Sequence, residues 1–174
     1  MTDQQAIKDC LSGNTHAYRH LVESYEEMAI KTAYRFVRDW DEARDAAQEA
    51  FIRAYQSLES FRAGSRFSTW FYRILVNLCT DRIRSSRFRK SVPLPVRPLA
   101  SDNPGPDADL EHRDLMEKAL KNLPIKRRQV FILMDLEGRR SKEVAKILGT
   151  TESTVRVHRM KAREQLRKVI VKLM

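Results

Sequence analysis

The stretch EVAKILGTTESTVRVHRMKAREQL, residues 143 to 166, decides the fold of the C-terminal part of the chain. An apolar stripe at helical spacing precedes Gly149, and a second one follows it. Gly149 supplies the left-handed backbone that ends the first helix, and Thr150 or Thr151 can cap the second. Val155 then places the second helix against the core. The spacing predicts a helix-turn-helix.

The second helix of this pair is basic along one side. Glu152, Arg156, Arg159 and Arg163 recur at i, i+4, i+7 and i+11, so they share a side of the helix. Arginine binds guanine edges through two parallel hydrogen bonds, and it also binds phosphates. Residues near the N-terminus of the helix, Ser153 among them, should lie deepest in a major groove. The alternative is an αα-hairpin whose arginines are only solvated.

Composition sets the fold class and the kind of partner. The 174 residues are 42% hydrophobic and 32% charged, with many helix formers, so we predict an all-α protein. The formal charge of +10 favours a polyanionic partner, nucleic acid before an anionic membrane surface. The N-terminus is polar, and the longest apolar run, Val130 to Met134, is far shorter than the roughly 20 residues that span a bilayer. We expect a cytoplasmic protein without membrane insertion.

Metal and cofactor chemistry finds little support in the sequence. Cys10 and Cys79 are far apart, which predicts buried thiols in a reducing compartment rather than a disulfide or a zinc site. His16 and His20 stand at i and i+4, but no HExxH motif or third ligand accompanies them. We therefore expect no catalytic residue, no metal and no cofactor.

The distribution of proline divides the chain. Five of the six prolines lie in residues 91 to 109, where helical periodicity disappears. This predicts a flexible Pro-rich linker between two small helical domains, residues 1 to 90 and 110 to 174. Residues 61 to 90 carry eight basic side chains and one acidic, and residues 139 to 172 carry eleven and three. Two basic regions predict two contacts with nucleic acid.

Helical spacing places further elements in both domains. Residues 16 to 38 should form one helix or a pair, and residues 110 to 122 another. Pro124 can begin a helix that ends at Gly138.

Residues 41 to 58 carry two different stripes. One is apolar and should be buried: Ala43, Ala47, Ala50, Phe51, Ala54 and Leu58. The other is acidic and partly apolar: Asp45, Gln48, Glu49 and Ile52. An exposed carboxylate side with an apolar neighbour can dock another protein, although composition alone favours a solvated surface.

Aromatic and basic residues alternate from Phe61 to Lys90. Aromatic faces stack on unpaired bases while arginines follow phosphates, which is typical of a surface for single-stranded DNA. Phe67 and Phe71 also fit a buried helical stripe, so most of the rings should belong to the core. We expect the DNA contacts in the loop Arg62 to Arg66 and on the polar side formed by Arg73, Asn77 and Arg84.

Five segments of the chain, taken together, resemble one family. They are DEARDAAQEAFIRAY, FRAGSRFSTWFYRILVNLCTDRIR, the proline-rich linker, LPIKRRQVFILMDLEG, and the helix-turn-helix quoted first. In this order and spacing, the chain resembles the bacterial RNA polymerase sigma factors of the extracytoplasmic-function group over nearly its whole length.

The resemblance implies a role for each segment. The acidic stripe would bind core RNA polymerase, at the beta-prime clamp helices, through Asp45, Gln48, Glu49 and Ile52. The beta subunit of the polymerase would be a further contact. The downstream segment would recognise and melt the -10 promoter element through Arg62, Ser65, Arg66, Arg73, Asn77 and Arg84. The last helix would read the -35 element through Thr151, Glu152, Ser153, Arg156, Arg159, Lys161 and Arg163. The linker, with Asp102 and Asp107, would thread toward the polymerase active centre and RNA exit channel, and an anti-sigma factor could be a further partner.

Two positions differ from the family pattern. Arg159 stands where relatives usually have an apolar residue, which affects the expected rotation of the last helix. Arg140 stands where Ser or Thr often opens the preceding helix, with Ser141 as an alternative cap.

The residues also admit other functions. A stand-alone repressor or activator would use the N-terminal domain for sensing or dimerisation, but the acidic docking stripe and the second basic segment argue against it. An enzyme acting on nucleic acid would need ligands beyond His16 and His20.

Overall fold

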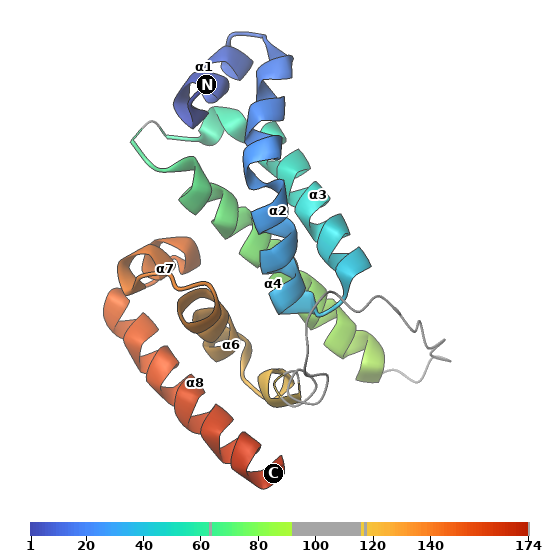
Figure 1. Ribbon diagram of the computed structural model, residues 1–174, viewed down its shortest axis with the longest axis vertical. Helices are drawn as coiled ribbons and strands as arrows, with labels where there is room; N and C mark the ends of the chain where they lie inside the picture. The colour runs from blue at the N-terminus through green and yellow to red at the C-terminus, as the bar shows by residue number, and fades with distance from the viewer. Residues whose placement is uncertain (63, 92–115, 117, 174) are drawn as a thin grey trace. The chain divides into compact units, whose positions relative to one another are not determined.

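The computed structural model describes residues 1–62, 64–91, 116 and 118–173, and the regular elements within these residues are helical (Figure 1). This confirms the all-α prediction. The chain divides into two compact units, residues 1–96 and 97–174. The predicted linker lies outside the described residues except for Ser91, and so do Asp102, Asp107 and the first part of the helix expected from residue 110. The predicted domain boundaries stay a prediction.

The N-terminal unit is built on three long helices. Its elements are α1 (Asp3–Leu11), the short 3-10 turn η1 (Thr15–Ala17), α2 (Tyr18–Val37), α3 (Trp40–Gln56), a second 3-10 turn η2 (Leu58–Ser60) and α4 (Phe67–Ser91). Helices α2, α3 and α4 pack against one another in every pairing. The apolar stripe predicted on residues 41 to 58 is buried, as expected, and its small alanines let α3 approach its neighbours closely.

The turn between α2 and α3 is made by two adjacent residues. Arg38 ends α2 in the left-handed conformation, at φ 63°. Asp39 caps α3, because its side chain accepts a hydrogen bond of 2.8 Å from the backbone N–H of Glu42. The expected helix or pair over residues 16 to 38 is therefore α2, preceded by the η1 turn.

The C-terminal unit holds the helix-turn-helix. Residues 118–121 are helical, and α6 (Ile125–Phe131), η3 (Ile132–Leu136), α7 (Ser141–Leu148) and α8 (Glu152–Leu173) follow. The helix expected from Pro124 to Gly138 thus changes, after Phe131, into the wider π-helical turn of η3. Helix α8 packs on both α6 and α7. Its core partners include Leu120, Leu123 and Phe131, which meet Ala162 and Leu166 of α8.

The turn of the helix-turn-helix has the predicted chemistry. Gly149 ends α7 at φ 63° and ψ 42°, and Val155 is completely buried. Thr151 is the cap of α8, since its hydroxyl oxygen accepts a hydrogen bond of 3.2 Å from the N–H of Thr154. The expectation that Ser141 caps α7 is wrong. Ser141 is already the first helical residue, and its hydroxyl instead donates to the Glu152 carboxylate over 3.0 Å.

Candidate functional site

Helix α8 has one side buried and the opposite side open. Val155, Ala162 and Leu166 are buried and define the inward side. At about 3.6 residues per turn, Val157 and Met160 fall on the opposite side. They are exposed despite being large and apolar, at 45% and 61%. We call the exposed surface of Ser153, Arg156, Val157, Met160 and Lys161 the outward face of α8.

The sequence predicted the basic residues of this face but not Val157 and Met160. Exposed apolar side chains on a DNA-binding helix can contact thymine methyl groups. A helical projection anchored on Val155 would have revealed both, because each lies well away from the buried side in that projection.

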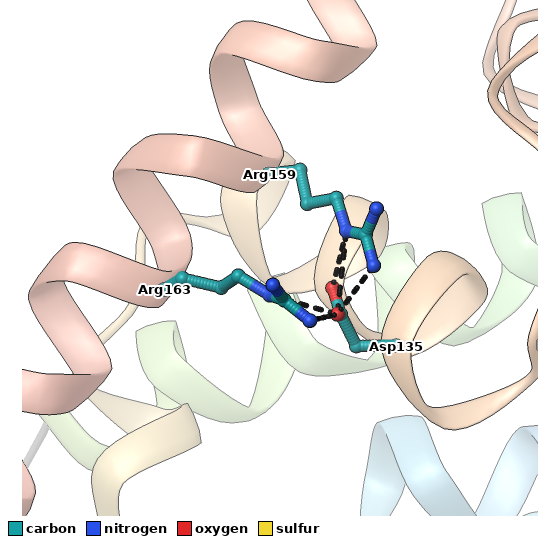
Figure 2. A network of polar contacts seen from close by, with 3 residues as sticks. All are labelled: Asp135, Arg159 and Arg163. Carbon is teal, nitrogen blue, oxygen red and sulfur yellow. Dashed lines mark hydrogen bonds and ion pairs between the residues drawn. The ribbon is translucent and has the colours of Figure 1, made fainter.

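A buried carboxylate binds two of the arginines predicted to touch DNA (Figure 2). Asp135 of η3 is only 7% exposed in its side chain. Arg159 donates from Nε to Oδ2 over 3.1 Å and from Nη2 to Oδ1 over 2.9 Å. Arg163 donates from Nε to the same Oδ1 over 2.9 Å, and its Nη2 lies 2.6 Å from that oxygen. The hydrogen bonds from Arg159 to Asp135 raise the pKa of Arg159.

The N-terminal turn of α8 contains a second ion pair. The Glu152 carboxylate accepts hydrogen bonds of 3.0 Å from Arg156 and of 3.0 Å from the Ser141 hydroxyl of α7. Thus Glu152, Arg159 and Arg163 share a flank of α8, as predicted, but this flank contacts the rest of the unit. Their direct contact with DNA stays a prediction, as does that of Thr151, which caps the helix.

In the N-terminal unit, the buried aromatic rings of α4 and its exposed polar side chains lie on different sides of the helix. Phe67, Phe71 and Tyr72 are buried, and the Phe71 ring stacks on Phe51 with centroids 4.5 Å apart. Most of the aromatic residues there are therefore core, as expected. The polar residues Arg73, Asn77 and Arg84 are all exposed and share one side of the helix at i, i+4 and i+11.

The loop before α4 borders an open pocket. Arg62, Ser65 and Arg66 of this loop are exposed. The pocket, of about 270 Å³, is lined by Phe61, Ser65 and Arg66 from the loop, with Tyr25 of α2 and Asp3 of α1. The Tyr25 hydroxyl donates to the Asp3 carboxylate, and burial raises the pKa of Tyr25. An aromatic ring, an arginine and hydrogen-bonding groups thus meet around one cavity.

Helix α3 presents only part of its predicted docking stripe to solvent. Asp45 and Gln48 are exposed, and Ile52 is 50% exposed. Glu49, however, binds Arg53 of its own helix over 2.6 Å and Arg82 of α4 over 2.9 Å. The hydrogen bond from Arg82 lowers the pKa of Glu49. Glu49 therefore joins two helices as well as facing outward.

A groove beside this stripe was not anticipated from the sequence. It has a volume of about 820 Å³ and runs between α2 and α3. Its lining is mostly apolar and includes Tyr18, Val22, Phe51, Ile52 and Tyr55. Ile52 and Gln48 of the stripe belong to its wall, so the stripe and the groove form one continuous surface.

The described residues form neither a cluster of metal ligands nor a membrane-spanning helix. Within the described residues no group of three or more His, Cys, Asp or Glu side chains could hold a metal ion. His20 lies beside Asp3, with Nε2 and Oδ1 4.0 Å apart. In the part of the chain that the structure describes, no helix is long and apolar enough to cross a membrane.

Known proteins resemble this chain in both units. Residues 21–89 match the family model Sigma-70 region 2, and residues 113–166 match Sigma-70, region 4. The ECF RNA polymerase sigma factor SigW of Bacillus subtilis is 32% identical over 97% of this chain and 96% of its own length. The RNA polymerase sigma-H factor of Pseudomonas aeruginosa is also 32% identical, over 99% of this chain and 95% of its own.

A solved structure shares the fold. It is the sigma factor RpoE of Bartonella quintana in complex with the anti-sigma factor NepR. It superposes with a TM-score of 0.69 at 22% identity and covers 88% of this chain and 96% of that one.

Proposed function

The chain belongs to the ECF family of RNA polymerase sigma factors, and from this premise we propose how its surfaces bind core RNA polymerase and direct it to promoters. The observation that supports the assignment of surfaces is their distribution. A basic, exposed recognition helix lies in the C-terminal unit, and a second exposed polar surface with an adjoining pocket lies in the N-terminal unit. Two DNA contacts and a protein-docking stripe are what a promoter-selecting subunit needs.

We assign the upstream, -35 element to the outward face of α8. Arg156 is placed to donate to a guanine edge, while Val157 and Met160 can contact thymine methyl groups. Ser153 and Lys161 border this face, and we expect Lys161 to meet phosphate. Thr151, Glu152, Arg159 and Arg163 support the helix from its end and its flank.

We assign the downstream, -10 element to the loop at residues 62–66 and the polar side of α4. Arg62, Arg66, Arg73 and Arg84 would follow phosphates, and Asn77 can read a base edge. An unstacked base would enter the pocket bordered by Phe61 and Ser65. Stacking on a protein surface contributes about 1 to 3 kcal/mol per base, which offsets the similar cost of opening a base step.

We assign polymerase docking to the exposed part of α3. Asp45 and Gln48 would pair with polar partners on the beta-prime clamp helices, and Ile52 would enter an apolar contact continuous with the α2–α3 groove. An apolar anchor with a polar rim is the usual composition of a protein interface.

The protein would act in the cytoplasm, on a stress- or envelope-responsive set of genes. Its relative from Bartonella quintana binds an anti-sigma factor, and we propose a partner of that kind here.

One experiment tests the function. The purified protein is added to core RNA polymerase that lacks any sigma subunit, and transcripts are sequenced from a random promoter library. Initiation at sites sharing two spaced elements is expected. Duplex binding without dependence on polymerase would favour a repressor, and absence of both would refute the assignment. Ile52→Glu should reduce initiation at limiting polymerase concentration, whereas Val171→Glu, the same change at an exposed apolar residue of the other unit, should not.

A further inference from the structure

Asp135 places an almost buried carboxylate behind the recognition helix. A charge with so little exposure is costly unless it is paired and hydrogen-bonded. Both of its oxygens accept hydrogen bonds from Arg159, and Oδ1 also accepts from Arg163. The two arginines lie on successive turns of α8, whereas Asp135 belongs to the π turn of η3 (Figure 2). One carboxylate therefore attaches two turns of α8 to a separate element.

This attachment occupies one of the two hydrogen-bonding edges of Arg159, the Nε–Nη2 edge. Bidentate binding of a guanine edge requires two N–H groups of one guanidinium fork. Nε and Nη2 of Arg159 both donate to Asp135, so this edge is already used within the protein. Arg156 differs, because its partner Glu152 lies on the same helix, one turn earlier, and their ion pair is exposed.

The attachment also acts on the rotation of α8 about its axis. Arg159 and Arg163 lie on the flank between the buried side and the outward face. The ion pairs with Asp135 hold this flank against η3, and Val157 and Met160 on the outward face of the helix then lie toward solvent. Arg159 thus carries a charge close to the buried side of α8, and Asp135 accommodates that charge at the edge of the core.

We infer that Asp135 is a positioning residue of the surface that reads the -35 element, an inference that rests on the proposed function. By binding Arg159 and Arg163 it sets the rotation of α8 and keeps two guanidinium groups away from phosphates. Base preference at the upstream element therefore depends on a carboxylate that does not touch DNA.

The test uses the holoenzyme, formed from core polymerase and the full chain. Its affinity is measured for the preferred promoter and for every single-base change in the upstream element, at several salt concentrations. For Asp135→Asn the released arginines should reach phosphates, so the slope of log affinity against log salt should steepen by about 0.9 per new contact. Discrimination against single-base changes should fall about threefold or more, because α8 loses the rotation that directs Arg156, Val157 and Met160 toward base edges.

A second substitution separates positioning from loss of structure. In Asp135→Asn combined with Arg159→Gln, the salt slope should return toward the wild-type value, which a merely disrupted domain would not do. Glu164→Gln is the matched control, since it also removes one negative charge from the unit and releases Lys168 instead. An equal steepening in Glu164→Gln would overturn the inference.

Arg159→Gln alone carries the test if Asp135→Asn does not fold, as judged by circular dichroism. In Arg159→Gln, discrimination against single-base changes should fall. The slope of log affinity against log salt should stay at the wild-type value, because Arg159 does not bind phosphate. A shallower slope would show direct contact with DNA and would overturn the inference, as would wild-type discrimination in both variants. If the wild-type holoenzyme has no preference at an upstream element, the proposed function fails and this inference fails with it.

Discussion

Glu49 of α3 binds Arg82 of α4 across the N-terminal unit, with Oε2 and Nη2 2.9 Å apart. The contact joins the helix assigned to polymerase docking to the helix assigned to the -10 element. Glu49 also binds Arg53, so one carboxylate accepts from two guanidinium groups.

Glu49→Gln should lower the free energy of unfolding by up to about 1 kcal/mol at neutral pH, since both ion pairs are partly exposed. The folded-state pKa of Glu49 is lowered, chiefly by Arg82. Its contribution is therefore present above the ordinary value of 4.5 and is lost as the pH falls through the lowered pKa. Urea titrations from pH 7 to pH 3 should show the wild type and variant converging. A constant difference, or an equal loss in Asp45→Asn, would contradict this.

Ile52→Glu should weaken core polymerase binding about tenfold without unfolding the unit, because the side chain is half exposed and anchors an apolar contact. Fluorescence anisotropy of the labelled protein against core polymerase measures the affinity. Val171→Glu serves as the control for the same substitution at an exposed position of α8. Equal affinities of Ile52→Glu and Val171→Glu for core polymerase would show that Ile52 is not part of the docking surface.

Arg156→Ala should relax base preference at one position of the upstream element, at a cost of about 1 to 3 kcal/mol for the preferred base. Arg167→Ala, an exposed residue farther along α8, should instead weaken binding to all sequences alike. Affinity for a set of single-base promoter changes distinguishes the two patterns. An unchanged preference in Arg156→Ala would exclude it from direct readout.

Gly149→Ala should destabilise the C-terminal unit by about 1 to 2 kcal/mol, because the residue ends α7 at φ 63° and a Cβ disfavours the left-handed region. Thr150→Ala, at the adjacent exposed position, should change the unfolding free energy by no more than about 0.5 kcal/mol. Urea denaturation followed by circular dichroism makes the comparison. Equal changes in unfolding free energy for Gly149→Ala and Thr150→Ala would show that the left-handed conformation at residue 149 does not disfavour alanine.

Cys79 should react with thiol reagents only when the N-terminal unit opens. The thiol is fully buried in α4, and burial raises its pKa to about 12, so the reactive thiolate is scarce at neutral pH. The prediction that Cys10 is also buried is wrong, since Cys10 is partly exposed, and it should react first. Labelling with a chromogenic disulfide, followed by mass spectrometry of the peptides, gives the order. Rapid labelling of Cys79 in the native protein would contradict its burial.

Local patterns predicted most of the elements correctly. The alanine stripe of α3 is buried, Gly149 adopts the left-handed conformation, Thr151 caps α8 and Val155 enters the core. Each of these depends on neighbours within one or two helical turns, and such short-range preferences can be read along the chain. The same patterns failed at Ser141, which was predicted to cap α7. Its hydroxyl instead donates a hydrogen bond to Glu152, eleven residues later in the chain.

The functional surfaces were only partly predictable for the same reason. Helical spacing correctly grouped Glu152, Arg159 and Arg163 on one side of α8, with Arg156 where this side meets the outward face. It did not show that this side contacts Asp135 and Ser141, because those contacts cross between elements. The groove between α2 and α3 and the pocket beside residues 61–66 likewise arise from side chains of different helices.

The sequence alone thus determined the helical class, the helix-turn-helix, the basic recognition helix and the resemblance to a family. These depend on periodicity, caps and composition, which are local. The tertiary structure decided which charges face outward and which are bound within the protein. An arginine has the same charge in either setting, and only a carboxylate brought close by folding, as Asp135 is to Arg159, determines whether its hydrogen bonds are already satisfied.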